Sequence, residues 1–130
     1  MKNLAIDRLI KELREQFEGF PDLRTGRNMQ YEIADAGMGA FSVFFTQSAS
    51  FLEYQEDMKR LKGRSNAENL FGMRNIPSDS HIRTLLDPVV PQFLHPMYRQ
   101  VFERLEAAGL LDNFRSHARS LLVALDGTEY

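Results

Sequence analysis

Residues 94–109 read LHPMYRQVFERLEAAG and contain the clearest helical pattern of the chain. Apolar side chains recur in this stretch at steps of three and four residues: Leu94, Met97, Tyr98, Val101, Phe102, Leu105 and Ala108. That spacing places them on one stripe of a helix, and such a stripe normally faces a protein core. Gly109 follows at a position where helices commonly stop. The stretch therefore predicts a mainly α protein.

The same periodicity predicts two helices near the start of the chain. Residues 4–17 carry one apolar stripe, and Gly19 ends it. A second helix is expected over 31–45. Its glycines Gly37 and Gly39 each cost roughly 1 kcal/mol relative to alanine in a helix. Small residues at these positions would also permit close contact with another helix.

Three shorter helices are expected in the middle of the chain, each beginning after a serine that can cap it. A serine hydroxyl accepts a hydrogen bond from a backbone N–H of the first turn, and a glutamate three residues later completes a capping box. The three starts are Ser50 with Glu53, Ser65 with Glu68, and Ser78, and the corresponding ends are Gly63, Gly72 and Asp87.

Residues 121–125 read LLVAL and lead directly into Asp126. An unbroken apolar run of this length predicts a buried strand. A single strand has no pairing partner, so either it packs as a tail or its sheet lies beyond the end of this chain. The expected fold is thus mainly α, with a multi-helix, bundle-like domain over 1–118 and one C-terminal strand that opens a second unit over 119–130.

Composition places the chain among ordinary globular proteins. A length of 130 residues allows one domain with its own core, and 43% hydrophobic with 26% charged residues argues against wholesale disorder. The absence of cysteine excludes disulfides, thiolate zinc sites and cysteine nucleophiles, and it suits a reducing cytoplasm. No stretch resembles a signal peptide or a membrane span. We expect a soluble, cytoplasmic protein without a membrane partner.

Charge is distributed unevenly along the chain. The net charge is −2, made up of −4 over residues 1–58, +4 over 59–83 and −2 over 84–130. A basic middle between acidic flanks can attract phosphate groups locally even though the total is negative. The alternative is a solvated surface whose charges happen to cluster.

Three groups of motifs carry a resemblance to a known family. They are FFTQS at 44–48 with SFLEYQ at 50–55, then IPSD at 76–79 with HIR at 81–83 and LLDP at 85–88, then LLVALDGTEY at 121–130. In this order they resemble the N-terminal part of bacterial insertion-sequence transposases of the DDE type. The resemblance implies that 121–125 is the first strand of an RNase H-like catalytic sheet, the rest of which this chain lacks.

The resemblance also implies a role for Asp126. In the intact enzyme this residue would be the first of three catalytic carboxylates, which hold Mg²⁺ for displacement at phosphorus. A single carboxylate does not make such a site, and Glu129 stands too close in sequence to replace the missing glutamate. We expect no catalytic activity, and no cofactor, in this chain alone.

Two of the short helices, 66–71 and 78–86, have the order of a helix-turn-helix, whose second helix enters the major groove of DNA. The connection at 72–77 is longer than the usual turn. The expected contacts to phosphates and base edges come from the following residues: Lys59, Arg60, Lys62, Arg64, Arg74, Ser80, Arg83 and Thr84. The alternative is a pair of ordinary packing helices with a solvated basic surface.

The function expected from sequence is DNA binding by the N-terminal region of a truncated transposase, with the double-stranded ends of the transposon as partner. A second hypothesis is a non-catalytic helical interaction module, which pairs with itself or with full-length transposase and inhibits it. A third is a remnant with no present role. Salt-dependent binding to duplex DNA separates the first hypothesis from the others.

Overall fold

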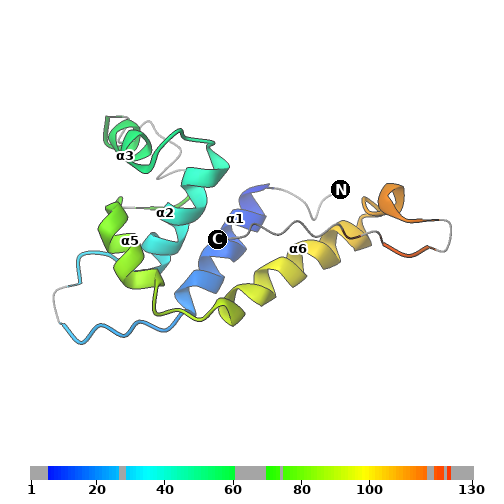
Figure 1. The fold of residues 1–130 in the computed structure, drawn as a ribbon, viewed down its shortest axis with the longest axis horizontal. Helices are drawn as coiled ribbons and strands as arrows, with labels where there is room; N and C mark the ends of the chain where they lie inside the picture. The colour runs from blue at the N-terminus through cyan, green and yellow to red at the C-terminus, as the bar shows by residue number, and fades with distance from the viewer. Residues whose placement is uncertain are drawn as a thin grey trace, which may run out of the picture.

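The computed structural model describes residues 6–26, 29–60, 70–73, 75–116, 119–121 and 123. This part of the chain is mainly helical, as expected. Its elements are α1 (Ile6–Glu18), α2 (Ile33–Phe45), α3 (Phe51–Arg60), α5 (Asp79–Leu86), a 3-10 turn at Pro91–Leu94, α6 (His95–Ala107) and a second 3-10 turn at Asp112–Phe114 (Figure 1). None of the helices described is long and apolar enough to cross a membrane.

Helix α2 is the centre of the fold, because α1 and α5 both pack against it (Figure 1). All residues from Ile33 to Gly39 are buried. A β-carbon at Gly37 would overlap the ring of Phe17 from α1, and one at Gly39 would lie 3.0 Å from Cδ1 of Ile82 in α5. The two glycines therefore let two helices approach α2 closely, which confirms the close-contact interpretation of these small residues.

The main core is formed by side chains of α1, α2 and α3 and of the segments that follow α1 and precede α5. Its buried members are Ile10, Phe17, Phe20, Ile33, Ala34, Met38, Tyr54, Met58, Phe71 and Met73. Tyr54 of α3 is fully buried, and its hydroxyl shares a hydrogen bond with the buried Ser42 hydroxyl of α2. Burial raises the pKa of Tyr54, and the Ser42 hydrogen bond partly opposes that shift. The pair satisfies two buried polar groups at once and fixes α3 on α2.

The predicted helix starts at Ser50 and Ser78 are confirmed. The backbone N–H of Glu53 donates to Oγ of Ser50 at 3.1 Å, and the N–H of His81 donates to Oγ of Ser78 at 3.4 Å. Each serine thus satisfies a backbone donor that the first helical turn leaves unpaired. The helix predicted at the first of these starts is described only as far as Arg60.

The helix predicted over 66–71 falls largely on residues that the structure does not describe. Its last two residues, Leu70 and Phe71, are described and lie in a turn. The ring of Phe71 packs edge-on against Phe41 and Phe45 of α2. Gly72 follows with φ of +64°, a backbone conformation that suits glycine and turns the chain away from a helix.

Helix α6 departs from its prediction. The helix forms over His95–Ala107 and Gly109 follows it with φ of +69°, as expected, but none of its residues is buried. Leu94, Met97 and Leu105 are half-buried, whereas Tyr98 and Phe102 are exposed. The predicted apolar side chains do share one side of the helix, but the described part of the chain covers only one edge of that side.

The predicted C-terminal strand also lies largely outside the described residues. Leu121 forms an isolated antiparallel bridge with Arg115, and Val123 is exposed. No other pairing involves the described part of this stretch, and the described residues contain no regular strand. The second unit over 119–130 stays a prediction.

The contrast between Gly37 and Gly39 predicts different effects for two alanine substitutions. Gly37→Ala forces Phe17 out of its position, and we expect a loss of roughly 1–3 kcal/mol in the free energy of unfolding. Gly39→Ala meets only the flexible tip of Ile82 and gains helix propensity, so we expect a change within about 1 kcal/mol. Urea unfolding of both variants measures this. Equal effects would contradict the close-packing account.

Candidate functional site

Helix α5 presents one apolar and one polar face. Ile82 and Leu85 are buried and pack with Ala36 of α2. Ser80, Arg83 and Thr84 lie on the opposite side, and all three are exposed. This is the arrangement expected for the second helix of a DNA-binding pair, and it also suits any amphipathic surface helix.

The polar side chains of α5 are engaged with one another. Nε of Arg83 donates to Oδ1 of Asp79 at 3.1 Å, and the Thr84 hydroxyl donates to the backbone oxygen of Ser80 at 2.8 Å. The hydroxyls of Ser78 and Ser80 are 3.0 Å apart. The Arg83–Asp79 ion pair is solvent-exposed, so its contribution to stability is about 0–1 kcal/mol. A phosphate can therefore replace Asp79 as the partner of Arg83 at little cost.

Two of the basic residues that the sequence predicts to contact DNA lie in the last turn of α3. Lys59 and Arg60 are both exposed, and Arg60 donates to Oδ1 of Asp57 at 2.9 Å. Nε2 of Gln55, one turn earlier, donates to the backbone oxygen of Pro77 at 3.4 Å, which connects α3 to the residues before α5. The remaining predicted residues lie outside the described part of the chain: Lys62, Arg64, Arg74 and Asp126.

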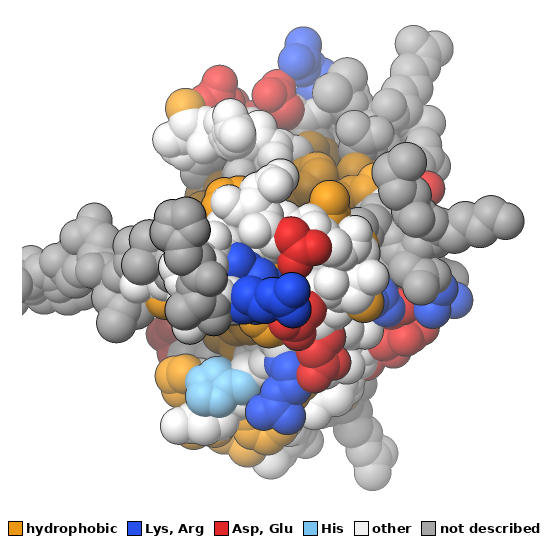
Figure 2. All heavy atoms as spheres, turned by 90° about the vertical axis from the view of Figure 1, so that its right-hand side faces the viewer, with side chains coloured by type: hydrophobic (Ala, Val, Ile, Leu, Met, Phe, Trp, Pro, Cys, Tyr) orange, Lys and Arg blue, Asp and Glu red, His pale blue; other side chains and the backbone are white. Residues whose placement is uncertain are grey.

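Charges elsewhere on the surface are mixed in sign. On the face drawn in Figure 2, basic side chains lie beside acidic ones, with hydrophobic side chains exposed between them. Ion pairs such as Arg115–Glu106 agree with this pattern. Among the residues described, no group of three histidine, cysteine or carboxylate side chains could hold a metal ion.

His81 makes contacts that the sequence did not indicate. Its ring lies 5.1 Å from that of Tyr31 in an edge-on arrangement, and its Nδ1 is 2.7 Å from Oγ of Ser78. The side chain remains exposed at the start of α5. It belongs to the cap of this helix.

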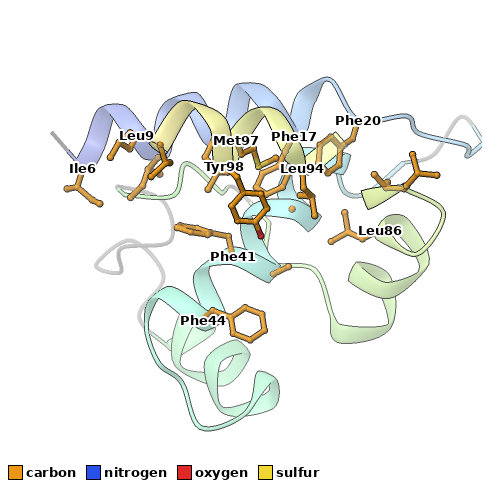
Figure 3. A pocket seen from close by; sticks show the side chains of 17 residues that line it. Ile6, Leu9, Phe17, Phe20, Phe41, Phe44, Leu86, Leu94, Met97 and Tyr98 are labelled. Atoms are coloured by element: carbon orange, nitrogen blue, oxygen red, sulfur yellow. The ribbon is translucent and has the colours of Figure 1, made fainter. Parts of the chain in front are cut away.

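A large apolar groove is the main feature that the sequence did not predict. It measures about 530 Å³ and opens between α1, α2, the 86–90 segment and α6 (Figure 3). Tyr98 of α6 and Phe41 of α2 both extend into it (Figure 3). Its lining residues are Ile6, Leu9, Ile10, Leu13, Phe17, Phe20, Gly37, Ala40, Phe41, Phe44, Leu86, Val89, Val90, Leu94, Met97, Tyr98 and Val101. None of them is charged, so the groove suits an apolar occupant.

Polar contacts hold the α1 and α6 walls of the groove together. The Glu12 carboxylate of α1 pairs with Arg104 of α6 and accepts from Nε2 of Gln100 at 2.9 Å. It also accepts from Nε of Arg8 at 2.9 Å. The Arg104 hydrogen bond holds the pKa of Glu12 below its ordinary value, against an opposing effect of burial. Helix α6 thus docks on α1 through a charged network as well as through apolar contacts.

No protein-family model, curated protein or solved structure matches this chain. The resemblance to transposases therefore rests on the sequence motifs alone.

The Glu12 network predicts a pH-dependent contribution to stability. Because the folded pKa of Glu12 lies below its ordinary value of 4.5, the network stabilises the fold above that pH and the effect is lost as the pH falls through the folded pKa. We expect Glu12→Gln to lower the free energy of unfolding by about 1–3 kcal/mol at neutral pH. The difference from the unmodified protein should shrink in acid.

Urea unfolding at neutral and acid pH checks this prediction. Glu15→Gln is the matched control, because Glu15 is an exposed carboxylate on the same helix whose nearest basic nitrogen, on Lys11, is 4.0 Å away. We expect almost no effect from the control. A Glu12→Gln effect that stays the same in acid would show that the charge of Glu12 is not responsible.

Proposed function

We propose that this chain is the DNA-binding, helical N-terminal region of a transposase. The observation that supports this most directly is the exposed polar face of α5, where Ser80, Arg83 and Thr84 lie opposite the buried Ile82 and Leu85. A helix held rigidly on its apolar side with short polar and basic side chains outward can be placed in a major groove. Because the sequence motifs resemble those of transposases, we propose that the partner of this face is the double-stranded ends of the transposon.

Electrostatic contacts would supply most of the affinity. Lys59 is exposed and forms no ion pair with another described residue, and the exposed pairs of Arg60 and Arg83 are weak enough to exchange for phosphates. Each phosphate neutralised releases condensed counterions, so binding should weaken steeply with salt. Lys62, Arg64 and Arg74 belong to the same proposal on sequence grounds.

The proposal for the C-terminal end concerns the intact enzyme. There, 121–125 would be the first strand of an RNase H-like sheet and Asp126 would supply one carboxylate to a Mg²⁺ site. The described residues offer no set of metal ligands that could accompany it. The activity proposed for this chain by itself is DNA binding.

A second candidate function is a helical interaction module that pairs with itself or with full-length transposase and inhibits it. The apolar groove favours this reading, since exposed apolar grooves commonly receive a protein segment. The two functions are compatible, because the described residues proposed to contact DNA do not line the groove. These residues are Lys59, Arg60, Ser80, Arg83 and Thr84.

Fluorescence anisotropy of a labelled duplex tests the DNA proposal. We expect binding at low salt that weakens as salt rises, and we expect Arg83→Ala to reduce the slope of log affinity against log salt by about 1. Lys11→Ala is the matched control, because Lys11 forms an exposed i,i+4 pair like that of Arg83 but lies on α1.

Two outcomes would contradict the proposal. Absence of salt-dependent binding would remove DNA as the partner. Equal losses from Arg83→Ala and Lys11→Ala would show that any binding is general attraction to basic side chains rather than contact through α5.

A further inference from the structure

One side of α6, next to the apolar groove, carries an apolar row that the described chain covers only in part. Tyr98, Phe102 and Leu105 follow one another at steps of four and three residues, the spacing of a helix–helix seam. Tyr98 is 71% exposed and Phe102 is 42% exposed. Because the row adjoins the apolar groove through Tyr98, the two form one continuous apolar surface.

Two charged residues beside this row form no ion pair with another residue that the structure describes. Arg99 and Glu103 are both exposed and occupy positions four apart on α6. Among the arginines that the structure describes, every one except Arg99 and Arg119 forms an ion pair within the chain. Glu103 likewise pairs with no described residue. Arginine and tyrosine are among the residue types enriched at the hot spots of protein interfaces, and Arg99 stands next to Tyr98 here.

The order of these charges along α6 makes the face complementary to itself. Arg99 lies two residues before Val101 and Glu103 lies two residues after it. Consider a twofold axis that is perpendicular to the helix and passes at the height of Val101. It relates two copies of α6 that run in opposite directions. It also brings the side of α6 that carries Arg99 and Glu103 next to the same side of the second helix. Arg99 of each chain would then stand opposite Glu103 of the other.

The apolar row fits the same arrangement. With a rise of about 1.5 Å per residue, Tyr98 lies roughly 4.5 Å before the axis, while Phe102 and Leu105 lie roughly 1.5 and 6 Å after it. Twofold symmetry reverses these positions in the second copy. The Tyr98 side chain of one chain therefore falls between Phe102 and Leu105 of the other, as interdigitating helices require.

We propose that a second copy of this chain covers α6, forming an antiparallel α6–α6 dimer centred on Val101. The charge pattern favours a second copy as the partner. A single twofold axis pairs Arg99 with Glu103 of the other chain and also packs the two apolar rows between each other. The proposal deepens the second candidate function by naming the partner of this surface. It does not depend on DNA binding.

Sedimentation equilibrium of the full chain without DNA tests the dimer. We expect reversible dimerisation in the micromolar range, and dissociation constants raised on the order of tenfold for Arg99→Glu and for Glu103→Arg, since each reversal sets like charges opposite each other twice. An equimolar mixture of the two variants should recover association. In the mixed dimer the two acidic positions of one chain face the two basic positions of the other.

The mixture separates contact between chains from effects within one helix. Each variant alone loses any attraction between positions 99 and 103 of its own α6, and mixing cannot restore that. Glu56→Arg is the matched control for Glu103→Arg, because Glu56 is an exposed glutamate on α3 without an ion pair to another described residue. Circular dichroism and thermal unfolding confirm that each variant folds.

Three results would overturn the proposal. They are a monomeric unmodified chain throughout the micromolar range, single variants that associate as strongly as the unmodified chain, and a mixture that associates no better than its components. Loss of DNA binding in the same preparation would affect only the proposal for α5, because the dimer is measured without DNA.

Discussion

The close approach of α1 and α5 to the glycine-bearing face of α2 is the constraint on which the rest of this structure depends. Phe17 occupies the space that a side chain at Gly37 would fill, and Ile82 sits against Gly39. Because protein interiors are close-packed, these contacts fix the positions of both outer helices. The polar face of α5 is thereby turned outward, and α1 becomes one wall of the apolar groove.

The contacts around α2 and those of α6 differ mainly in how deeply they are buried. Around α2 the contacts are mainly apolar, with one buried hydroxyl pair between Ser42 and Tyr54 and an ion pair between Arg14 of α1 and the buried Asp35. Helix α6 is held on α1 partly by the charged network of Glu12 and Arg104, and none of its residues is buried. A helix attached by one edge leaves apolar surface available, which is what a protein partner requires. The same chain therefore presents a polar face on α5 and an apolar one on α6.

Sequence reasoning succeeded where the signal was local. The caps at Ser50 and Ser78, the stop at Gly109 and the opposed faces of α5 all follow from chemistry within one or two helical turns. It failed where the outcome depended on distant contacts. The α6 stripe predicted a buried face, because periodicity identifies an apolar side without saying what covers it. The groove could not be predicted for the same reason, since its lining comes from segments far apart in the chain.

Backbone amide chemical shifts recorded during titration with duplex DNA test the central claim most directly. The account predicts that the largest changes fall on Ser80, Arg83 and Thr84 of α5 and on the last turn of α3, with α1 little affected. Changes concentrated on α1 and α6, or no changes at low salt, would contradict the assignment of α5 as the DNA-facing helix.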